Sequence, residues 1–296
     1  MLPIDAIERE RLDVIHTMLK TARDPKARLL HAPSSRLKRL NISGNNFPKV
    51  MDLCCGTGIW LLEMAEEFKD AVFYGYDINR LAPGSLRSNI QINCQVDVES
   101  SWESSNIAAD FDVIHLQLAL GAIKDWNLLY SRIRTHLKPG TGWFESVEID
   151  WTPRFTDDSL RIGDLEAWWN QISLAFQWLG YPISYSQTTK EALQRAGFCD
   201  IQNQEYEIPL SSWNTTNSQL YKSGVWCNIA MSAESEGNRG LEAMSLRPFY
   251  EINNRQPHDT TQLCGKAMEE ASNPDVHAYF KLHVWWARAP HPSEGG

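Results

Sequence analysis

The chain has 296 residues, of which 43% are hydrophobic and 22% charged, the balance of a globular protein with a sizeable core. Its formal net charge of −9 argues against a nucleic-acid partner, because broad nucleic-acid surfaces neutralise phosphates with lysine and arginine. The sequence has no apolar run of about 18 residues and no basic-then-apolar N-terminal signal, so we expect a cytoplasmic protein with no membrane segment.

An amphipathic helix over residues 4–20 is the first predicted element. Apolar side chains recur there at roughly helical spacing with charged side chains between them, at Ile4, Ile7, Leu12, Ile15 and Leu19. A connector rich in Pro, Ser, Gly and Asn follows over residues 32–48. The basic run at 28–39 is interpreted as a solvated segment rather than a localisation signal.

The stretch from Val50 to Trp60 combines a short apolar strand, an acid at Asp52, and a turn that contains Gly56 and Gly58. It predicts a strand over 50–53, a tight turn, and a helix over 57–68. Such a turn brings backbone N–H groups and the positive end of a helix to the carboxyl edge of a sheet. The stretch therefore predicts a site for a nucleotide-like ligand.

Strands and helices alternate after this turn. The predicted elements are strands over 72–76, 90–96, 112–115 and 143–149, a turn at Pro83 and Gly84, and a helix over 127–137. Alternation with short connections predicts an α/β fold with a doubly wound, parallel sheet.

Beyond residue 151 the pattern becomes mainly helical. We expect helices over 160–179 and 188–196, a strand over 200–210, about three helices over 211–275, and a last strand over 277–288. Eight of the 12 tryptophans occur from Trp151 onward. They are interpreted either as aromatic walls around an apolar small molecule or as ordinary core residues.

The spacing of glycines and acids favours one nucleotide-like ligand over another. The third glycine of the dinucleotide pattern G-x-G-x-x-G is replaced by Leu61. Asp77 ends the second predicted strand, where a carboxylate can accept hydrogen bonds from both ribose hydroxyls. Asp97 ends the third, where an acid can accept from the adenine amino group. Acids at three successive strand ends favour S-adenosylmethionine over NAD.

Together with four later phrases, these features resemble the LaeA-like group of fungal S-adenosylmethionine-dependent methyltransferases. The phrases are Phe111-Asp112-Val113-Ile114-His115, Gly121-Ala122-Ile123-Lys124-Asp125-Trp126, Leu137-Lys138-Pro139-Gly140 and His277-Ala278-Tyr279-Phe280. The resemblance covers the chain from about Glu8 to Pro290. It implies the seven-stranded, Rossmann-like methyltransferase sheet with an antiparallel last strand and a helical cover.

The resemblance also implies a cofactor site for S-adenosylmethionine, with S-adenosylhomocysteine as the product. Asp52 and the two turn glycines would hold the amino-acid end of the cofactor, and Asp77 the ribose. Asp97 with the backbone of Val98 would hold the adenine, and His115 would lie beside the sulfonium. The expected cofactor-binding residues are Asp52, Cys54, Cys55, Gly56, Thr57, Gly58, Asp77, Ile78, Asn79, Asp97, Val98 and His115.

One turn residue departs from the pattern of the group. Cys54 stands where the group has glycine, and we expect its Cβ to crowd the closest approach of the backbone to the cofactor. The six cysteines are scattered and show no C-x-x-C spacing, at Cys54, Cys55, Cys94, Cys199, Cys227 and Cys264. This pattern predicts reduced thiols, with no metal site and no disulfide framework.

Catalysis of methyl transfer depends mainly on positioning the nucleophile in line with the methyl group. A base helps when the nucleophile is a phenol, an enol or an amine, whereas a carboxylic acid is already ionised at neutral pH. His115, at the end of the fourth predicted strand, and Glu148, near the end of the fifth, are the candidate catalytic bases. A packed or capping imidazole is an equally good interpretation of His115.

The resemblance and the pattern together predict a single domain over residues 1–296. It would comprise an N-terminal helical segment (1–48), a cofactor-binding half (49–151), a helical substrate cover (152–182 and 211–275) and segments that complete the sheet (183–210 and 276–290).

Three functions are compatible with the sequence. The first is a methyltransferase that acts on a small, largely apolar secondary metabolite at an O, N or C atom. The second is a LaeA-like regulator of secondary metabolism in a nuclear complex, which a long N-terminal arm or a clear basic signal would favour. The third is an enzyme that keeps the cofactor bound and catalyses a rearrangement or cyclisation.

Overall fold

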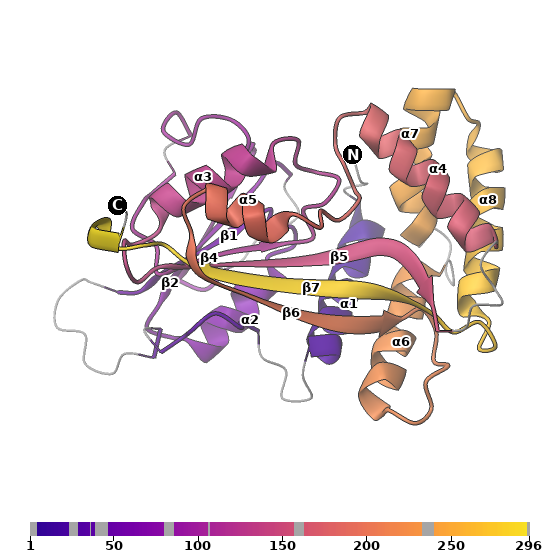
Figure 1. Ribbon diagram of the computed structural model, residues 1–296, viewed down its shortest axis with the longest axis horizontal. Coiled ribbons are helices and arrows are strands. Elements are labelled where there is room, and N and C mark those ends of the chain that lie inside the picture. The colour runs from indigo at the N-terminus through magenta and orange to yellow at the C-terminus, as the bar shows by residue number, and fades with distance from the viewer. Residues whose placement is uncertain are drawn as a thin grey trace.

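The computed structural model describes residues 5–23, 29–35, 37–38, 47–79, 86–105, 107–156, 163–232 and 240–294. Within these ranges the chain forms a seven-stranded sheet in the order β3-β2-β1-β4-β5-β7-β6 (Figure 1). The turn predicted at Pro83 and Gly84 lies outside the described residues, as do Arg28, Arg36 and Arg39 of the basic run at 28–39. None of the helices described is long and apolar enough to cross a membrane.

The first five strands of the sheet run parallel to one another. They are β1 (Lys49–Leu53), β2 (Val72–Asp77), β3 (Ile90–Cys94), β4 (Val113–Gln117) and β5 (Trp143–Phe155). The last two strands, β6 (Cys199–Pro209) and β7 (Ala278–Arg288), complete the sheet, with β7 antiparallel to both β5 and β6. The predicted α/β fold, with its antiparallel last strand, is confirmed.

Helices cover both faces of the parallel strands because the buried strand residues alternate between the faces. Val50 and Phe73 pack with α2 (Ile59–Glu67) on one face. Met51 and Ile114 pack on the other with α3 (Trp126–His136) and α5 (Thr189–Arg195). The carboxyl ends of β1, β2 and β4 therefore lie at one edge of a sheet that is buried on both sides.

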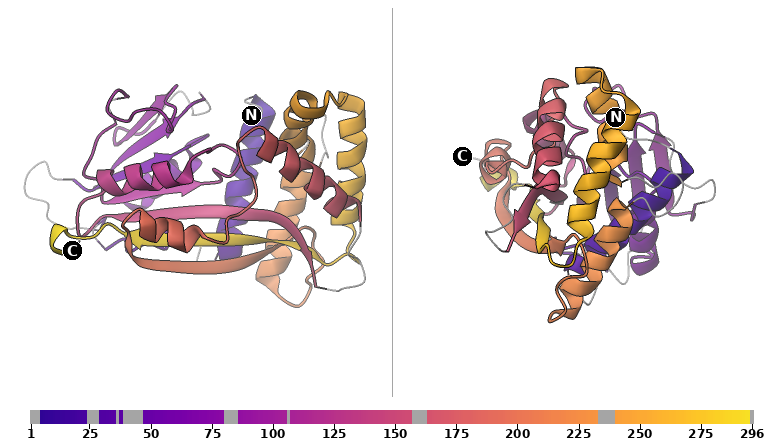
Figure 2. Two further views of the ribbon diagram at one scale, coloured as in Figure 1. Left: turned by 45° about the horizontal axis from the view of Figure 1, so that its top comes forward. Right: turned by 90° about the vertical axis from the view of Figure 1, so that its right-hand side faces the viewer.

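A second group of helices stands at one end of the sheet, beside the long strands β5 and β7 (Figure 2). It consists of α4 (Asp164–Trp178), α6 (Ser218–Met231), α7 (Gly240–Asn253) and α8 (Pro257–Ser272). Trp168 is buried there and donates from Nε1 to Ser245 Oγ at 2.8 Å. The three helices predicted over 211–275 correspond to α6, α7 and α8.

Three strand ends differ from the prediction by two residues or more. β4 continues past His115 to Gln117, so His115 lies within the strand rather than at its end. β3 stops at Cys94 rather than at residue 96, because Gln95 has a left-handed backbone with φ of 64°. β5 continues beyond residue 149 to Phe155, past Pro153, and its pairing with β7 shifts register between Asp150 and Arg154. Such an irregularity lets a strand accommodate a proline that cannot donate to the ladder.

The first helix, α1 (Ala6–Arg23), packs against α6 and α2 and lies across the edge of the sheet where the parallel strands end (Figure 1). Its buried face carries charged side chains as well as apolar ones. The buried residues are Glu8, Arg11, Ile15, His16, Met18, Leu19, Ala22 and Arg23.

Two glycine substitutions test the packing of the sheet. A Cβ at Gly75 in β2 would lie 2.7 Å from Leu61 Cδ1 and 2.9 Å from Cys55 Sγ, so Gly75→Ala should lower the free energy of unfolding by about 1–3 kcal/mol. Gly265 in α8 is exposed, with no atom within 4 Å of an added Cβ, so Gly265→Ala should raise it by about 0.5–1 kcal/mol. Urea unfolding measures both. Effects of the same sign would contradict the described packing.

Candidate functional site

The turn after β1 has an unusual backbone that presents N–H groups at the sheet edge. Cys54, Gly56 and Gly58 have φ values of 55°, 54° and 77°, all in the left-handed region. A Cβ on Gly58 would lie 2.8 Å from Ile92 Cδ1, so Ile92 would have to shift to admit a side chain there. Cys54 adopts this backbone at a cost of about 1–2 kcal/mol, which explains why glycine suits the position.

Asp77, at the end of β2, holds this turn in place. Its Oδ2 accepts from Gly56 N at 2.8 Å and its Oδ1 from Asn79 N at 2.7 Å. Burial raises the pKa of Asp77, although these two backbone hydrogen bonds oppose the shift. Each carboxylate oxygen keeps a free lone pair, which can accept from a ribose hydroxyl.

Asp52 is paired with His115 on the neighbouring strand β4, and their Oδ1 and Nδ1 atoms are 2.7 Å apart. The Trp60 ring stacks on the imidazole at 3.8 Å between centroids. Burial raises the pKa of Asp52 and lowers the pKa of His115 to about 3. The imidazole of His115 is therefore uncharged at neutral pH.

A cavity of about 320 Å³ opens over this turn. We group its lining residues into two halves by the elements that supply them. The turn and the strand ends supply Asp52, Cys54, Cys55, Gly56, Thr57, Asp77, Ile78, Asn79, Asp97 and Val98. The other half is largely apolar and aromatic, lined by Leu118, Leu120, Trp151, Phe176, Tyr181, Ile183 and Met244. The expected cofactor residues thus meet at one cavity, except Gly58 and His115, which do not line it.

The outer part of the first half suits a flat base. Asp97 lies in the loop after β3 rather than at the strand end, and its Oδ1 accepts from Glu99 N at 2.8 Å. Ile78 is 60% exposed although it lines the cavity, whereas Val98 is buried. An exposed apolar side chain beside a carboxylate offers a ring both a packing surface and an acceptor.

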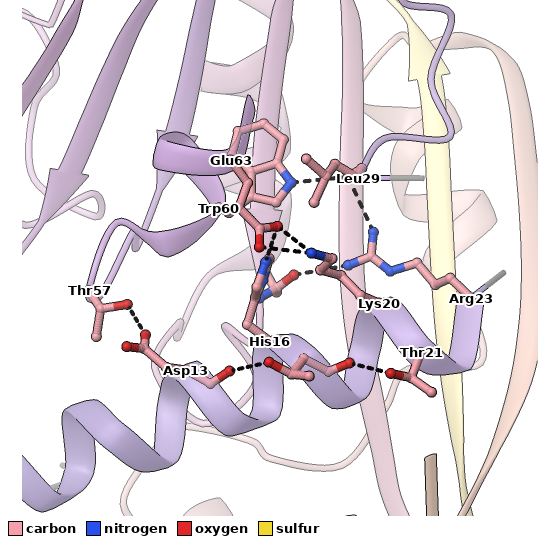
Figure 3. Close-up of polar contacts among 11 residues, drawn as sticks. Asp13, His16, Lys20, Thr21, Arg23, Leu29, Thr57, Trp60 and Glu63 are labelled. Atoms are coloured by element: carbon pink, nitrogen blue, oxygen red, sulfur yellow. Dashed lines mark hydrogen bonds and ion pairs between the residues drawn. The ribbon is translucent and has the colours of Figure 1, made fainter. Parts of the chain in front are cut away.

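Helix α1 forms a wall of the cavity that the sequence reasoning missed. Asp13 Oδ1 accepts from Thr57 Oγ1 at 2.6 Å (Figure 3). Leu12 Cδ1 would lie 3.8 Å from a Cβ on Gly56. Five residues of α1 line the cavity: Glu8, Arg11, Leu12, Ile15 and His16. A signal for this wall existed in the sequence, because charged residues occur on the same helical face as Leu12 and Ile15.

Charged side chains fasten α1 to the helix that follows the turn. Glu63 of α2 accepts from Lys20 Nζ at 2.8 Å and contacts His16 Nε2 at 3.0 Å (Figure 3). Although burial acts in the opposite direction, the hydrogen bonds from His16 and Lys20 lower the pKa of Glu63 to about 2. Glu63 is therefore ionised and holds His16 through its Nε2–H.

A fully buried ion pair fastens the other end of α1 to the sheet. Arg23 Nη1 lies 3.7 Å from Glu145 Oε1 on β5, and Arg23 Nη2 donates to Gln117 Oε1 at 3.1 Å. Glu145 Oε2 also accepts from the backbone N–H groups of His31 and Ala32, at 2.6 and 2.7 Å. Burial raises the pKa of Glu145 and lowers that of Arg23, whereas their mutual attraction opposes both shifts.

The two candidate catalytic bases lie behind the cavity wall. Neither His115 nor Glu148 is among the residues that line the cavity. Glu148 is buried, and its two oxygens accept from Ala119 N at 2.9 Å and Leu120 N at 3.2 Å. Burial raises the pKa of Glu148 to about 8, so it is mainly protonated at neutral pH. A base function for His115 or Glu148 stays a prediction.

The donors and acceptors of the first half fit S-adenosylmethionine. The acids Asp52, Asp77 and Asp97 can face its cationic and hydroxyl groups, and the left-handed turn lets the backbone approach it closely. Among the described residues, no group of three or more His, Cys, Asp or Glu could hold a metal ion. All six cysteines are free.

Comparisons with known proteins agree with this geometry. Residues 9–203 match the family described as "Methyltransferase domain". The secondary metabolism regulator LAE1 of Cochliobolus heterostrophus is 33% identical, over 98% of this chain and 90% of that protein. The protein-methionine methyltransferase laeA of Emericella nidulans is 34% identical, over 98% of this chain and 72% of that protein.

A solved structure of phosphoethanolamine N-methyltransferase 2 from Haemonchus contortus, in complex with S-adenosyl-L-methionine, has a similar fold. The TM-score is 0.50 at 14% identity, and the match covers 83% of this chain and 49% of that chain. This chain thus spans about half the length of that protein, and the likeness concerns the fold.

If Asp77 binds the ribose of the cofactor, substitution of Asp77 should lower the affinity for the cofactor. Asp77→Ala removes the acceptor for the ribose hydroxyls and should weaken S-adenosylhomocysteine binding by about 1–3 kcal/mol, measured by calorimetry. Asp70→Ala, at an exposed position beyond α2, is the matched control and should leave the affinity unchanged. Equal affinity of the two variants would contradict the assignment.

The buried carboxyl of Glu148 predicts that the stability difference between the wild type and Glu148→Gln depends on pH. The pKa of Glu148 is about 8 in the folded chain and about 4.3 in an unfolded chain. Its contribution to the free energy of unfolding is therefore complete below pH 4 and is lost as the pH rises to 8. Glutamine has no proton to lose. As the pH rises from 5 to 8, the free energy of unfolding of Glu148→Gln should therefore increase relative to that of the wild type. The increase should be on the order of 3 kcal/mol, since each pKa unit corresponds to about 1.4 kcal/mol.

Urea unfolding at the two pH values measures this difference. Glu207→Gln, at an exposed position on β6, is the control and should show the same difference from wild type at both. A pH-independent difference for Glu148→Gln would show that the Glu148 carboxyl ionises normally.

Proposed function

The chain belongs to the LaeA-like family of S-adenosylmethionine-dependent methyltransferases, and we propose that it methylates a small, largely apolar secondary metabolite at an O, N or C atom. The observation that carries the substrate class is the second half of the cavity. Its walls are apolar and aromatic, and they line the same cavity as the acids. Such a space takes an apolar molecule and excludes water.

The residues of the site act mainly by positioning. When bound, S-adenosylmethionine supplies an electrophilic methyl group. Asp52 and the turn would hold its amino-acid end, and Asp77 and Asp97 its ribose and adenine. Trp151 and Phe176 would pack against the substrate and orient its nucleophilic atom, and correct orientation contributes on the order of 7–11 kcal/mol in favourable cases.

His115 and Glu148 support this arrangement from behind the wall. His115 orients the Asp52 carboxyl, and Glu148 holds the backbone of Ala119 and Leu120. Leu118, with φ of 56°, and Leu120 both line the apolar half of the cavity. We therefore propose positioning functions for both residues. A substrate that is ionised or carries no proton on its nucleophilic atom would need no base.

A second candidate acceptor is the thioether of a protein methionine, with the chain acting as a regulator of secondary metabolism. The names of two relatives support it: one is a secondary metabolism regulator and the other a protein-methionine methyltransferase. A thioether is apolar, unbranched and has no proton to lose, so it suits a cavity whose candidate bases lie behind its wall. The metabolite enzyme would act in the cytoplasm and the regulator in the nucleus.

Incubation of the purified protein with S-adenosylmethionine and fractionated cell extract tests the proposal. We expect S-adenosylhomocysteine to form together with a small molecule that has gained one methylene unit of mass, both followed by mass spectrometry. The Asp77→Ala variant serves as the matched control and should form less of both. Methylation confined to the protein fraction would support the regulator, and a changed product without S-adenosylhomocysteine would contradict methyl transfer.

A further inference from the structure

The Glu8–Arg11 pair on α1 is buried at the cavity wall, although it has the spacing of an ordinary surface pair. Arg11 donates from Nε to Glu8 Oε2 at 2.8 Å and from Nη2 to Glu8 Oε1 at 2.6 Å. Both residues are only 3% exposed, and both line the cavity. A buried ion pair gains little net stability over apolar side chains of similar volume, because both charges lose their hydration.

The pair leaves one donor group of Arg11 unused. Arg11 Nη1 is buried and has no hydrogen-bond partner in the part of the chain that the structure describes. A guanidinium is charged at every accessible pH and matches carboxylates geometrically, so an unused buried N–H₂ indicates a missing anionic partner. Glu8 fixes the orientation of the guanidinium through two parallel hydrogen bonds.

The position of Arg11 indicates which anion it would meet. The next two residues of α1 lie directly over the turn after β1: Leu12 faces Gly56, and Asp13 is hydrogen-bonded to Thr57. This turn is where the amino-acid end of the cofactor is expected, and that end carries a carboxylate. Among the described residues that line the cavity, Arg11 is the sole lysine or arginine.

We propose that Arg11, oriented by Glu8, binds the α-carboxylate of S-adenosylmethionine. Helix α1 would then supply part of the cofactor site, opposite the acids of the sheet edge. Asp52 would face the ammonium group of the same amino-acid end. The carboxylate and the ammonium of the cofactor would then each meet an oppositely charged side chain, one from α1 and one from β1. The carboxylate would also distinguish the intact cofactor from its decarboxylated form.

Two ligands that differ only in the carboxylate test the proposal by calorimetry. S-adenosylhomocysteine has the group, and its decarboxylated analogue S-adenosyl-3-thiopropylamine lacks it. Wild-type protein should bind the first about 10–100-fold more tightly, the range expected for charge-assisted hydrogen bonds. The double variant Glu8→Gln, Arg11→Met, which leaves no unpaired buried charge, should bind both with similar affinity.

The comparison separates this function from a merely structural one. If α1 were only displaced in the variant, both ligands would lose affinity by the same factor and the preference would persist, which would overturn the proposal. Unchanged affinity for S-adenosylhomocysteine would also overturn it, because Arg11 would then serve another anion, such as a carboxylate of the substrate. The wild-type preference needs no variant, so it tests the proposal even if the variant does not fold.

Discussion

The docking of α1 onto the sheet is the constraint on which the rest of the site depends. It is achieved by charged side chains: His16 and Lys20 contact the partly exposed Glu63 in the middle of the helix, and Arg23 is paired with Glu145 at one end, where both side chains are fully buried. Removing one partner of such a buried pair costs about 3–5 kcal/mol, because the other charge stays uncompensated. The helix is therefore held in one position, and the cavity has a fixed second wall.

The cavity between these two walls has opposite chemistry in its two halves. Carboxylates and open backbone N–H groups at the sheet edge suit a ligand that carries cationic, hydroxyl and carboxylate groups. Apolar rings from β5, α4 and the segment that follows α4 suit an acceptor without charge and keep water away. Methyl transfer requires little more than this, since the reacting atoms need alignment and a dry surrounding. His115 and Glu148 lie behind the wall, where they orient other groups.

Much of this arrangement was predictable because it is local in sequence. The glycine turn, Asp52 and Asp77 lie at or next to strand ends that alternation identifies, and the fold follows from the same alternation. The wall formed by α1 was missed because charged residues are usually exposed, and the partner of Arg23, Glu145, lies far along the chain. The extension of β5 depends on its pairing with β7, which no local pattern contains.

Hydrogen exchange with and without S-adenosylhomocysteine tests most directly whether the cofactor lies between α1 and the sheet edge. Backbone amides of residues 8–16, 54–58, 77–79 and 97–98 should exchange more slowly when the ligand is present, because both walls would contact it. Exposed amides of β6, on the far edge of the sheet, should be unaffected. Protection of the sheet edge without protection of α1 would contradict the account, since the helix would then not be part of the site.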